Sequence, residues 1–360
     1  MNQIERAFFN ALQHAIANKQ LRKELFIKLT LDEWNVLYNI SREQGVLAII
    51  FDALKEISRD IPAQIRLKWA YATMLIENRY EKHLTLANEI CEEFSQHNIK
   101  TVVLKGFALS KYYPNPKHRE CGDFDCYLLG EFEHGNAIAE KLGANVRCDD
   151  YKHSHINYKG LIIENHKFCS AIRGPKVNKE FEKFIQHLLI ANEYGITPLN
   201  EHSMYCPTPT FNALFFLKHT MVHFLYEGIK VRHLLDWACL INNETENINW
   251  EIIEKWCDLL SLRNFVSLLN ETTNRYIGFD LHNINGTISD ETIDTFISNT
   301  LYSDTAVYNH NHSSIWAQRY AIFKNIILNR WKFSQVYKKP LFLELIKSSS
   351  AAIFERHPKL

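Results

Sequence analysis

The sequence predicts an α+β protein in which a small mixed β-sheet lies between two helical regions. Three features of the 360-residue chain support this fold class. Apolar residues recur at helical spacing in residues 1–97, short β-branched runs bounded by turn residues fill residues 98–177, and the helical pattern returns in residues 178–360. We therefore expect three regions with these boundaries, and the middle one is the α/β unit.

The composition limits the class of protein but names no partner. Hydrophobic residues make up 46% of the chain, which is enough for packed cores at this length. Basic and acidic residues both number 41, so no net charge draws the protein to nucleic acid or to an anionic membrane. The chain has no signal-like start and no apolar stretch of about 18 residues, so we expect a cytoplasmic protein without membrane insertion. The cysteines include no C-x-x-C pair, which favours reduced, mostly buried thiols over a zinc site.

A long helix is expected at the end of the N-terminal region. Asp60 supplies an N-cap, Pro62 fits the first turn, and the helix should end near Asn98. Residues on one predicted helical face are Trp69, Ala72, Ile76, Tyr80, Leu84, Ala87, Ile90 and Phe94.

The middle region predicts alternating short strands and helices. The run "IKTVVLKG" over 99–106 is rich in β-branched residues and closed by glycine, and "FALSKYY" over 107–113 has the spacing of a short helix. The later elements are a strand at 121–129, a helix at 134–143, and two strands at 153–158 and 160–168.

The segment "CGDFDCYLL" at 121–129 carries two aspartates at the start of a strand. Because side chains alternate along a strand, Asp123 and Asp125 share one face, with Cα atoms roughly 6.5–7 Å apart. Two carboxylates on one face favour a bound cation. The same pair alone also fits solvated turn residues, so the assignment depends on its surroundings.

A turn that suits an anion precedes the aspartates. Lys105 and Gly106 stand where a strand runs into a helix, which places backbone N–H groups and a positive dipole end at the turn, and glycine lets a phosphate approach closely. Glu164 lies in a later strand. If that strand is next to the aspartate strand, three carboxylates converge near the turn. Such a set suits two Mg²⁺ ions about 3.5–4 Å apart and phosphoryl transfer from a triphosphate.

Several motifs follow one another in this part of the chain. They are Leu104-Lys105-Gly106, Tyr113-Pro114, Arg119, Gly122-Asp123-Phe124-Asp125 and Glu164-Asn165-His166. In this order they resemble a family of bacterial proteins catalogued as uncharacterised nucleotidyltransferases, within the DNA polymerase β-like nucleotidyltransferase superfamily. The segment "VRHLLDWA" at 231–238 also resembles the helix that this family carries beyond its catalytic sheet. The similarity covers roughly residues 40–240.

The resemblance implies roles for the charged residues. Asp123 and Asp125 would hold both metal ions, Mg²⁺ or Mn²⁺, and Glu164 would complete the metal site beside the attacking group and help to activate it. Lys105 and Arg119 would contact the triphosphate, since arginine binds phosphate bidentately and lysine supplies a point charge. A surface salt bridge is the alternative for each of these two residues.

Two glycines and a histidine complete the implied nucleotide site. They are Gly106, Gly122 and His166, and the histidine contacts the nucleotide, orients a carboxylate, or simply packs. The superfamily's usual Gly-Ser at the phosphate turn is Gly106-Phe107 here, so Lys105 is expected to take over the charge role of the serine hydroxyl. If Glu164 is not the third carboxylate, Asp149 and Asp150 are the next candidates.

The sequence thus predicts a nucleotidyltransferase that moves a nucleoside monophosphate from an NTP onto a hydroxyl or phosphate acceptor and releases pyrophosphate. ATP is the default donor because it is abundant, and the acceptor is a small molecule, a peptide or protein side chain, or an RNA end. One alternative is a catalytically inactive nucleotide-binding or partner-binding scaffold with the same fold. Another is an RNA-binding module that uses the basic, aromatic tail from Arg319 onward, which includes "NRWKFSQVYKKP".

Two residue pairs in the C-terminal region have simpler interpretations. His219 and His223 share a helix face, but no glutamate follows His219 and the helix is apolar, so packing is favoured over zinc binding. Arg232 and Asp236, four residues apart, are expected to form an intrahelical ion pair that helps to dock the helical part against the sheet.

Overall fold

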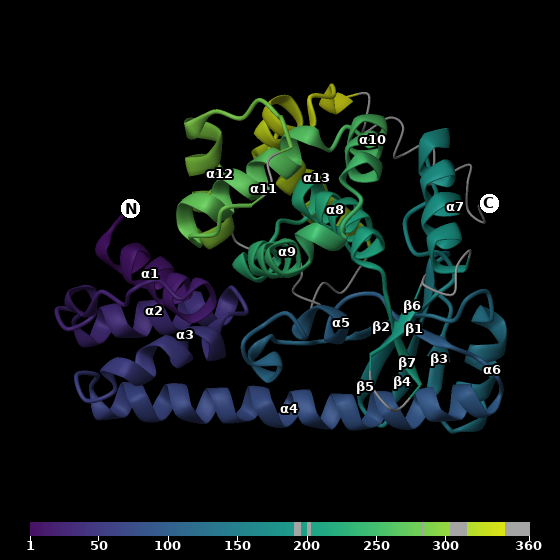
Figure 1. Cartoon of the computed structure of the whole chain (residues 1–360), viewed down its shortest axis with the longest axis horizontal. Coiled ribbons are helices and arrows are strands. Elements are labelled where there is room, and N and C mark those ends of the chain that lie inside the picture. The colour runs from purple at the N-terminus through teal and green to yellow at the C-terminus, as the bar shows by residue number, and fades with distance from the viewer. Residues whose placement is uncertain (191–195, 200–202, 282–283, 303–314, 343–360) are drawn as a thin grey trace.

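The structure, a computed structural model, describes residues 1–190, 196–199, 203–281, 284–302 and 315–342. Figure 1 shows helix α4 (Ala63–Gln96) along the base of the molecule, with the other N-terminal helices above one end and the β-sheet above the other. The C-terminal helices lie above the sheet. This arrangement confirms the predicted α+β fold, a mixed sheet flanked by helices.

Four helices make up the N-terminal region. The first two each begin with a capping box, Asn2 with Glu5 and Thr30 with Glu33, in which side chains and backbone N–H groups satisfy one another. The long predicted helix is confirmed, although its N-cap is Pro62 and not Asp60. The bounds of the three helices before it are α1 Gln3–Ala17, α2 Leu31–Glu43 and α3 Leu47–Leu54.

The strands that the structure describes form one seven-stranded sheet in the order β3-β4-β5-β2-β1-β7-β6. The central strand β2 is parallel to β5 and antiparallel to β1, and β5 is antiparallel to β4. Their bounds are β1 Thr101–Val103, β2 Phe124–Tyr127, β3 Asn145–Arg147, β4 His153–Tyr158, β5 Leu161–His166, β6 Ile196–Pro198 and β7 Met204–Pro207. The sheet is therefore mixed, as predicted, and β2 and β5 are neighbours, as the candidate site requires.

The sequence did not reveal three of the strands, β3, β6 and β7. Each has only three or four residues, and none lies in an apolar, β-branched run closed by glycine, the signal that reveals the equally short β1. β7 pairs in parallel with β1, with Thr101 opposite Met204. The sheet thus takes in a segment beyond residue 177, where the sequence places the C-terminal helical region, and the three-region division remains a prediction.

The two faces of the sheet have different surroundings. Phe124, Cys126, Ile156 and Ile163 are buried in a core that the sheet shares with α4 and with α6 (Phe132–Lys141). Side chains that alternate with these residues point to the other face, toward the C-terminal helices. That second face carries the polar residues of the candidate site.

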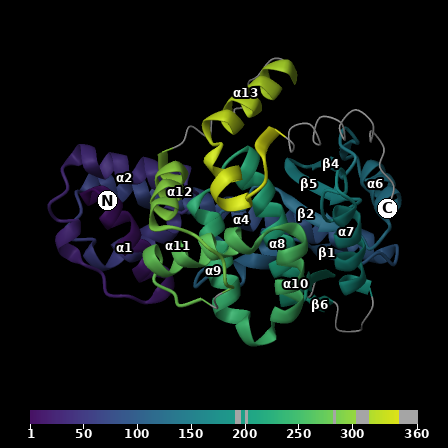
Figure 2. The same ribbon diagram turned by 90° about the horizontal axis from the view of Figure 1, so that it is seen from above.

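Among the C-terminal helices, α8 and α9 share a cavity wall with Asp125 of the second face, and others reach the N-terminal region. Their bounds are α7 Lys176–Ile190, α8 Pro209–Tyr226, α9 Val231–Glu244, α10 Trp250–Leu260, α11 Arg263–Tyr276, α12 Asp290–Tyr302 and α13 Ile315–Leu328. Seen from above, α11 and α12 lie beside the N-terminal helices (Figure 2). The Gln13 side chain donates to the carbonyl oxygen of Tyr276 at 3.1 Å, and the Gln44 side chain donates to that of Thr300 at 2.9 Å. The N-terminal helices and the C-terminal helices α11 and α12 are therefore joined by buried and half-buried polar contacts.

Part of the basic, aromatic tail is packed into the core. Lys332, Phe333 and Val336 are buried in a π-helical segment. The Lys332 ammonium lies 5.1 Å from the Phe224 ring centroid, and burial lowers the pKa of Lys332 to about 8. These residues therefore do not form the exposed surface that an RNA-binding module needs, and the tail from residue 343 lies outside the described residues.

The described helices include none that combines the length and the hydropathy needed to cross a bilayer.

All eight cysteines are free. Cys148 is exposed, and the seven others are buried. This agrees with the prediction of reduced, mostly buried thiols.

A buried histidine ties three elements together close to the candidate site. His118 contacts Asp52 of α3 through Nδ1 and Glu77 of α4 through Nε2, the latter at 2.8 Å. Burial acts to lower the pKa of His118, but the two carboxylates outweigh it, and the net pKa lies above its ordinary value. The imidazolium therefore holds the segment before Arg119 on the two helices.

Replacing His118 with Gln should remove a pH-dependent part of the stability. A histidine whose pKa is raised on folding stabilises the protein fully below its unfolded pKa of about 6.5, and this contribution is lost as pH rises through the folded pKa. The stability difference between wild type and His118→Gln should therefore be largest near pH 6 and should shrink toward higher pH. Urea unfolding across this range measures it, with His134→Gln, an exposed histidine beside Glu131, as control. A difference that grows with pH would contradict the charged form.

Candidate active site

Neighbouring strands align their polar side chains in rows across the second face of the sheet. Opposite residues in paired strands share a face. The first row consists of Asp125, Glu164, His155 and Arg147. The second row, two residues further along, consists of Tyr127, His166 and His153. The structure thus brings together Asp125, Glu164 and His166, which the sequence placed in one site.

Asp125 is buried and lies between two basic groups. Its Oδ1 is 2.8 Å from Lys105 Nζ and 3.1 Å from His166 Nε2. Burial acts to raise the pKa of Asp125, but Lys105 and His166 outweigh it, and the net pKa falls below the ordinary value. Burial acts to lower the pKa of Lys105, but Asp125 and Asp123 outweigh it, and the net pKa rises. Both groups are therefore charged at neutral pH.

Glu164 directs its two carboxylate oxygens toward different partners. Oε2 lies 3.5 Å from His166 Nε2, and Oε1 lies 3.8 Å from both His153 Nε2 and His155 Nε2. Burial acts to raise the pKa of Glu164, but the hydrogen bond from His166 and the charge of Lys105 lower it well below its usual range. A carboxylate that stays ionised in this way is suited to holding a cation and is a poor proton acceptor.

Three basic residues of the candidate site were not predicted from the sequence. Lys152 immediately precedes β4, and His153 and His155 lie on β4 next to Glu164. Burial is the main cause that lowers the pKa of His153 to about 4, and burial and the Lys105 charge lower the pKa of Lys152. The turn between β4 and β5 is the sequence signal that could have placed the two histidines. The residues Lys159 and Gly160 both have positive φ, as a two-residue hairpin turn requires, and such a turn fixes the register that sets His155 opposite Glu164.

The other acidic candidates have separate positions. Asp123 is half-buried and immediately precedes β2, which begins at Phe124, and its charge acts on both Lys105 and Glu164. Asp149 Oδ1 lies 3.1 Å from His155 Nδ1. Asp150 accepts the backbone N–H of Lys152 at 2.6 Å. The β2–β5 register pairs Asp125 with Glu164 and with neither of these two aspartates.

The predicted phosphate turn is present, with a shorter helix than expected. Gly106 has φ +55° and ψ −108°, a conformation open essentially to glycine only. The helix after it, α5, is the single turn Phe107–Ser110, so its dipole is small. The Lys105 side chain lies at this turn and on the wall of the cavity, and its expected role in place of the serine hydroxyl stays a prediction.

Replacing Gly106 with Val should weaken NTP binding. A Cβ at this position would meet only ordinary contacts, the nearest being the Asp123 carbonyl oxygen at 3.7 Å, so the cost comes from the positive φ. Strain of about 1–3 kcal/mol would shift the turn, and we expect the Kd for NTP to rise about fivefold or more. Calorimetry on a variant with unchanged circular dichroism tests this, and an unaltered Kd would remove Gly106 from the site.

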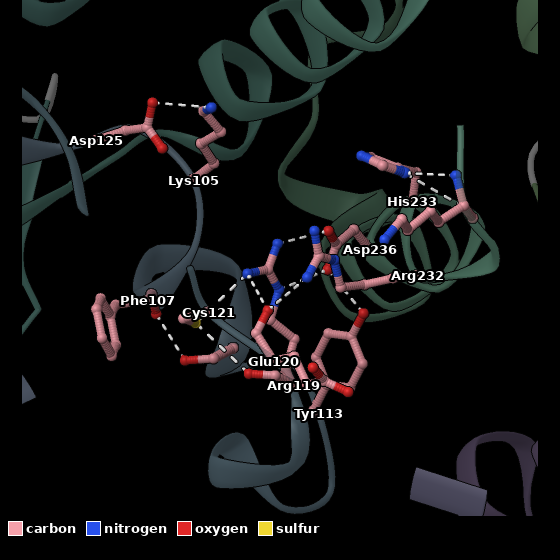
Figure 3. A network of polar contacts seen from close by, with 12 residues as sticks. Lys105, Phe107, Tyr113, Arg119, Glu120, Cys121, Asp125, Arg232, His233 and Asp236 are labelled. Carbon is pink, nitrogen blue, oxygen red and sulfur yellow. Dashed lines mark hydrogen bonds and ion pairs between the residues drawn. The ribbon is translucent and has the colours of Figure 1, made fainter. Parts of the chain in front are cut away.

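Arg119 belongs to a buried network that joins the sheet region to α9 (Figure 3). Its Nε and Nη2 donate to the two carboxylate oxygens of Asp236 at 3.0 and 2.7 Å, and the Tyr113 hydroxyl donates to Oδ1 at 2.7 Å. Arg232 donates to the backbone carbonyl oxygen of Glu120 at 2.9 Å. The predicted ion pair between Arg232 and Asp236 is therefore wrong, because Arg119 takes that carboxylate. The predicted contact of Arg119 with triphosphate remains a prediction.

A cavity of about 190 Å³ opens beside the aspartates, between the phosphate turn and helices α8 and α9. Residues on its wall include Lys105, Gly106, Arg119, Gly122, Asp123, Asp125, Phe215 and His219. The rings of Phe215 and His219 are stacked, with centroids 5.6 Å apart, and His219 Nε2 lies 2.9 Å from His223 Nε2. The cavity therefore joins charged groups that suit a phosphate to an aromatic wall.

The carboxylates fit a divalent metal ion by their chemistry. Ligand atoms of Asp125, Glu164 and His166 all lie within 4.8 Å of one another, and Asp123 stands on the cavity side of the same group. Carboxylate oxygens are the ligands that Mg²⁺ and Mn²⁺ prefer, and Mg²⁺ leaves positions for substrate phosphates. The close ion pair between Asp125 and Lys105 marks the position where such a cation would compete for the same oxygen.

Comparisons with known proteins identify the family of the chain. No curated protein and no solved structure matches the chain. A family model described as "Uncharacterised nucleotidyltransferase" matches residues 30–278, which is more than half of the chain and contains the whole candidate site. The chain therefore belongs to this uncharacterised nucleotidyltransferase family.

Proposed function

We propose that the protein transfers a nucleoside monophosphate from an NTP to a hydroxyl or phosphate acceptor and releases pyrophosphate. The observation that supports this proposal best is the register between β2 and β5, which sets Asp125 directly opposite Glu164. Lys105 and the Gly106 turn lie beside this pair, on the wall of the same cavity as Asp123. A nucleotidyltransferase family and a carboxylate set of this kind point to the same chemistry.

Asp123, Asp125 and Glu164 are the residues that we assign to metal binding, with Mg²⁺ or Mn²⁺ as the cofactor. When held by these carboxylates, the metal would supply positive charge that stabilises the leaving pyrophosphate. The chain itself holds the carboxylates in place: β2 and β5 fix two of them, and His166 donates toward both. Glu164 stays ionised and therefore acts as a ligand beside the attacking group.

Lys105 and the glycines form the part of the site that we assign to the triphosphate. Lys105 exposes about a fifth of its side chain (22%), so it can turn from Asp125 toward a phosphate oxygen. Gly106 and Gly122 leave room at the cavity wall, since a Cβ at Gly122 would meet no atom within 4 Å. Arg119 also lines the cavity wall, where Asp236 holds its guanidinium in place.

The donor and the acceptor are proposed by class only. ATP is the donor to test first, and the acceptor is a small molecule, a peptide or protein side chain, or an RNA end. The experiment is an assay of pyrophosphate release with each NTP, Mg²⁺ or Mn²⁺, and a cell extract as the source of acceptor. We expect release with the wild type and none above background with Asp123→Asn. NTP binding without release under all of these conditions would favour the inactive scaffold.

A further inference from the structure

We propose that His153, His155 and Glu164 form a second metal site that selects a divalent transition metal, of the Zn²⁺, Co²⁺ or Mn²⁺ class, over Mg²⁺. The site shares Glu164 with the carboxylate set that contains Asp125. Because this site adds to the proposed active site, the inference rests on the proposed function. Metal binding can nevertheless be measured without any substrate.

The β4–β5 hairpin brings the three ligands together. His155 is directly opposite Glu164, and His153 is two residues away on the same face of β4. Both Nε2 atoms are 3.8 Å from Glu164 Oε1, and ligand atoms of the three residues all lie within 4.8 Å of one another. Ligand atoms around a tetrahedral ion with bonds near 2.1 Å are about 3.4 Å apart. Small side-chain rotations therefore suffice to complete the site.

The His155 ring is already oriented for metal binding. Its Nδ1 faces Asp149 Oδ1 at 3.1 Å, while its Nε2 faces Glu164. A carboxylate that accepts the Nδ1 proton fixes the tautomer and leaves the Nε2 lone pair directed at the ion, as in many metal-bound histidines. Asp149 thus has a role that differs from the one considered in the sequence analysis.

The His153 ring has an incomplete set of partners. Its Nδ1 is buried and has no hydrogen-bond partner among the described residues, and its Nε2 has Glu164 as a charged neighbour. The atom available to a metal ion is Nε2, which faces Glu164 Oε1 at 3.8 Å. The His153 and His155 rings are close, with centroids 4.7 Å apart, so one ion can reach both.

The donor types distinguish this site from the carboxylate site. Two imidazoles and one carboxylate are a ligand set of transition metals, whereas Mg²⁺ demands oxygen ligands. Glu164 directs Oε1 toward the two imidazoles and Oε2 toward His166. Its carboxylate can therefore bridge the two sites. His155 is partly open to solvent, at 30%, which gives an ion a way in.

The test measures metal binding by the full-length protein, stripped with a chelator, free of any affinity tag and without nucleotide. Co²⁺ absorption reports the ligand geometry, and Zn²⁺ calorimetry gives the Kd. We expect one ion to bind to the wild type in the presence of millimolar Mg²⁺, and His153→Ala and His155→Ala to raise the Kd at least about tenfold. Asp149→Asn should weaken binding by about tenfold. His134→Ala, which removes an exposed histidine next to Glu131, should have no effect.

Two results would overturn the inference. One is unchanged Co²⁺ and Zn²⁺ binding in folded His153→Ala and His155→Ala variants, which would place the ion elsewhere, for instance at His219 and His223. The other is complete displacement of Co²⁺ by an equal concentration of Mg²⁺. Asp123→Asn should keep the Co²⁺ spectrum, because Asp123 is not in this ligand set. Metal binding without pyrophosphate release would refute the proposed function alone, and release without selective binding would refute this inference alone.

Discussion

Replacing Asp123 with Asn should abolish nucleotidyl transfer while leaving the protein folded. Asparagine has nearly the same volume but lacks the charge that a metal ion needs. The structure gives the Asp123 side chain no hydrogen bond or ion pair within the described residues, so its loss should cost little stability. If the carboxylate supplies several kcal/mol of transition-state stabilisation, kcat should fall about a hundredfold or more.

Asp123 is a better test of the metal site than Asp125. Asp125 also holds Lys105 and His166, so its replacement would remove a carboxylate partner from half-buried Lys105 and from buried His166. Initial rates of pyrophosphate release, together with a thermal melt of each protein, measure the effect. A folded Asp123→Asn protein with activity within a few-fold of wild type would refute the two-metal assignment.

Replacing Glu164 with Gln should separate binding from chemistry. Glutamine keeps the shape and hydrogen-bonding capacity of the side chain but removes the negative charge beside the attacking group. If Asp123 and Asp125 suffice to hold the metal–NTP complex, the Kd for NTP with Mg²⁺ should change less than about threefold, while turnover should fall about a hundredfold.

The comparison of calorimetry with turnover decides how Glu164 acts. Equal losses of affinity and turnover would mean that Glu164 helps to build the nucleotide site itself. No loss of either would move the third carboxylate to another residue, and Asp149 or Asp150 would then be examined. The geometry favours Glu164 over both, because Asp149 faces His155 and Asp150 binds a backbone N–H group.

The sequence predicted the central elements of the fold because their signals are local. The long helix α4 has a regular apolar stripe, and β4 and β5 are six-residue strands separated by a two-residue turn with glycine. The strands β6 and β7 were missed because they are short and because their place beside β1 depends on long-range pairing. β1 is equally short, but its β-branched run closed by glycine reveals it, whereas β6 and β7 each end in proline, which weakens a strand signal.

The site was predicted in part for the same physical reason. Asp125, Glu164 and Lys105 follow from motif order and strand alternation, and the structure brings them together. The pairing of Arg119 with Asp236 joins residues 117 positions apart, and no local spacing indicates it. The position of His155 was accessible, since the hairpin register follows from a two-residue turn that contains glycine.

A crystal structure with Mn²⁺ and a non-hydrolysable NTP tests the central claim most directly, because anomalous scattering locates each ion. We expect an ion bound to Asp123 and Asp125, with a Glu164 oxygen about 2.1 Å from a metal, and the triphosphate against Lys105 and Gly106. A Glu164 oxygen farther than about 5 Å from every ion that Asp123 or Asp125 also binds, or a triphosphate bound away from the Lys105–Gly106 turn, would contradict the active site proposed for this protein.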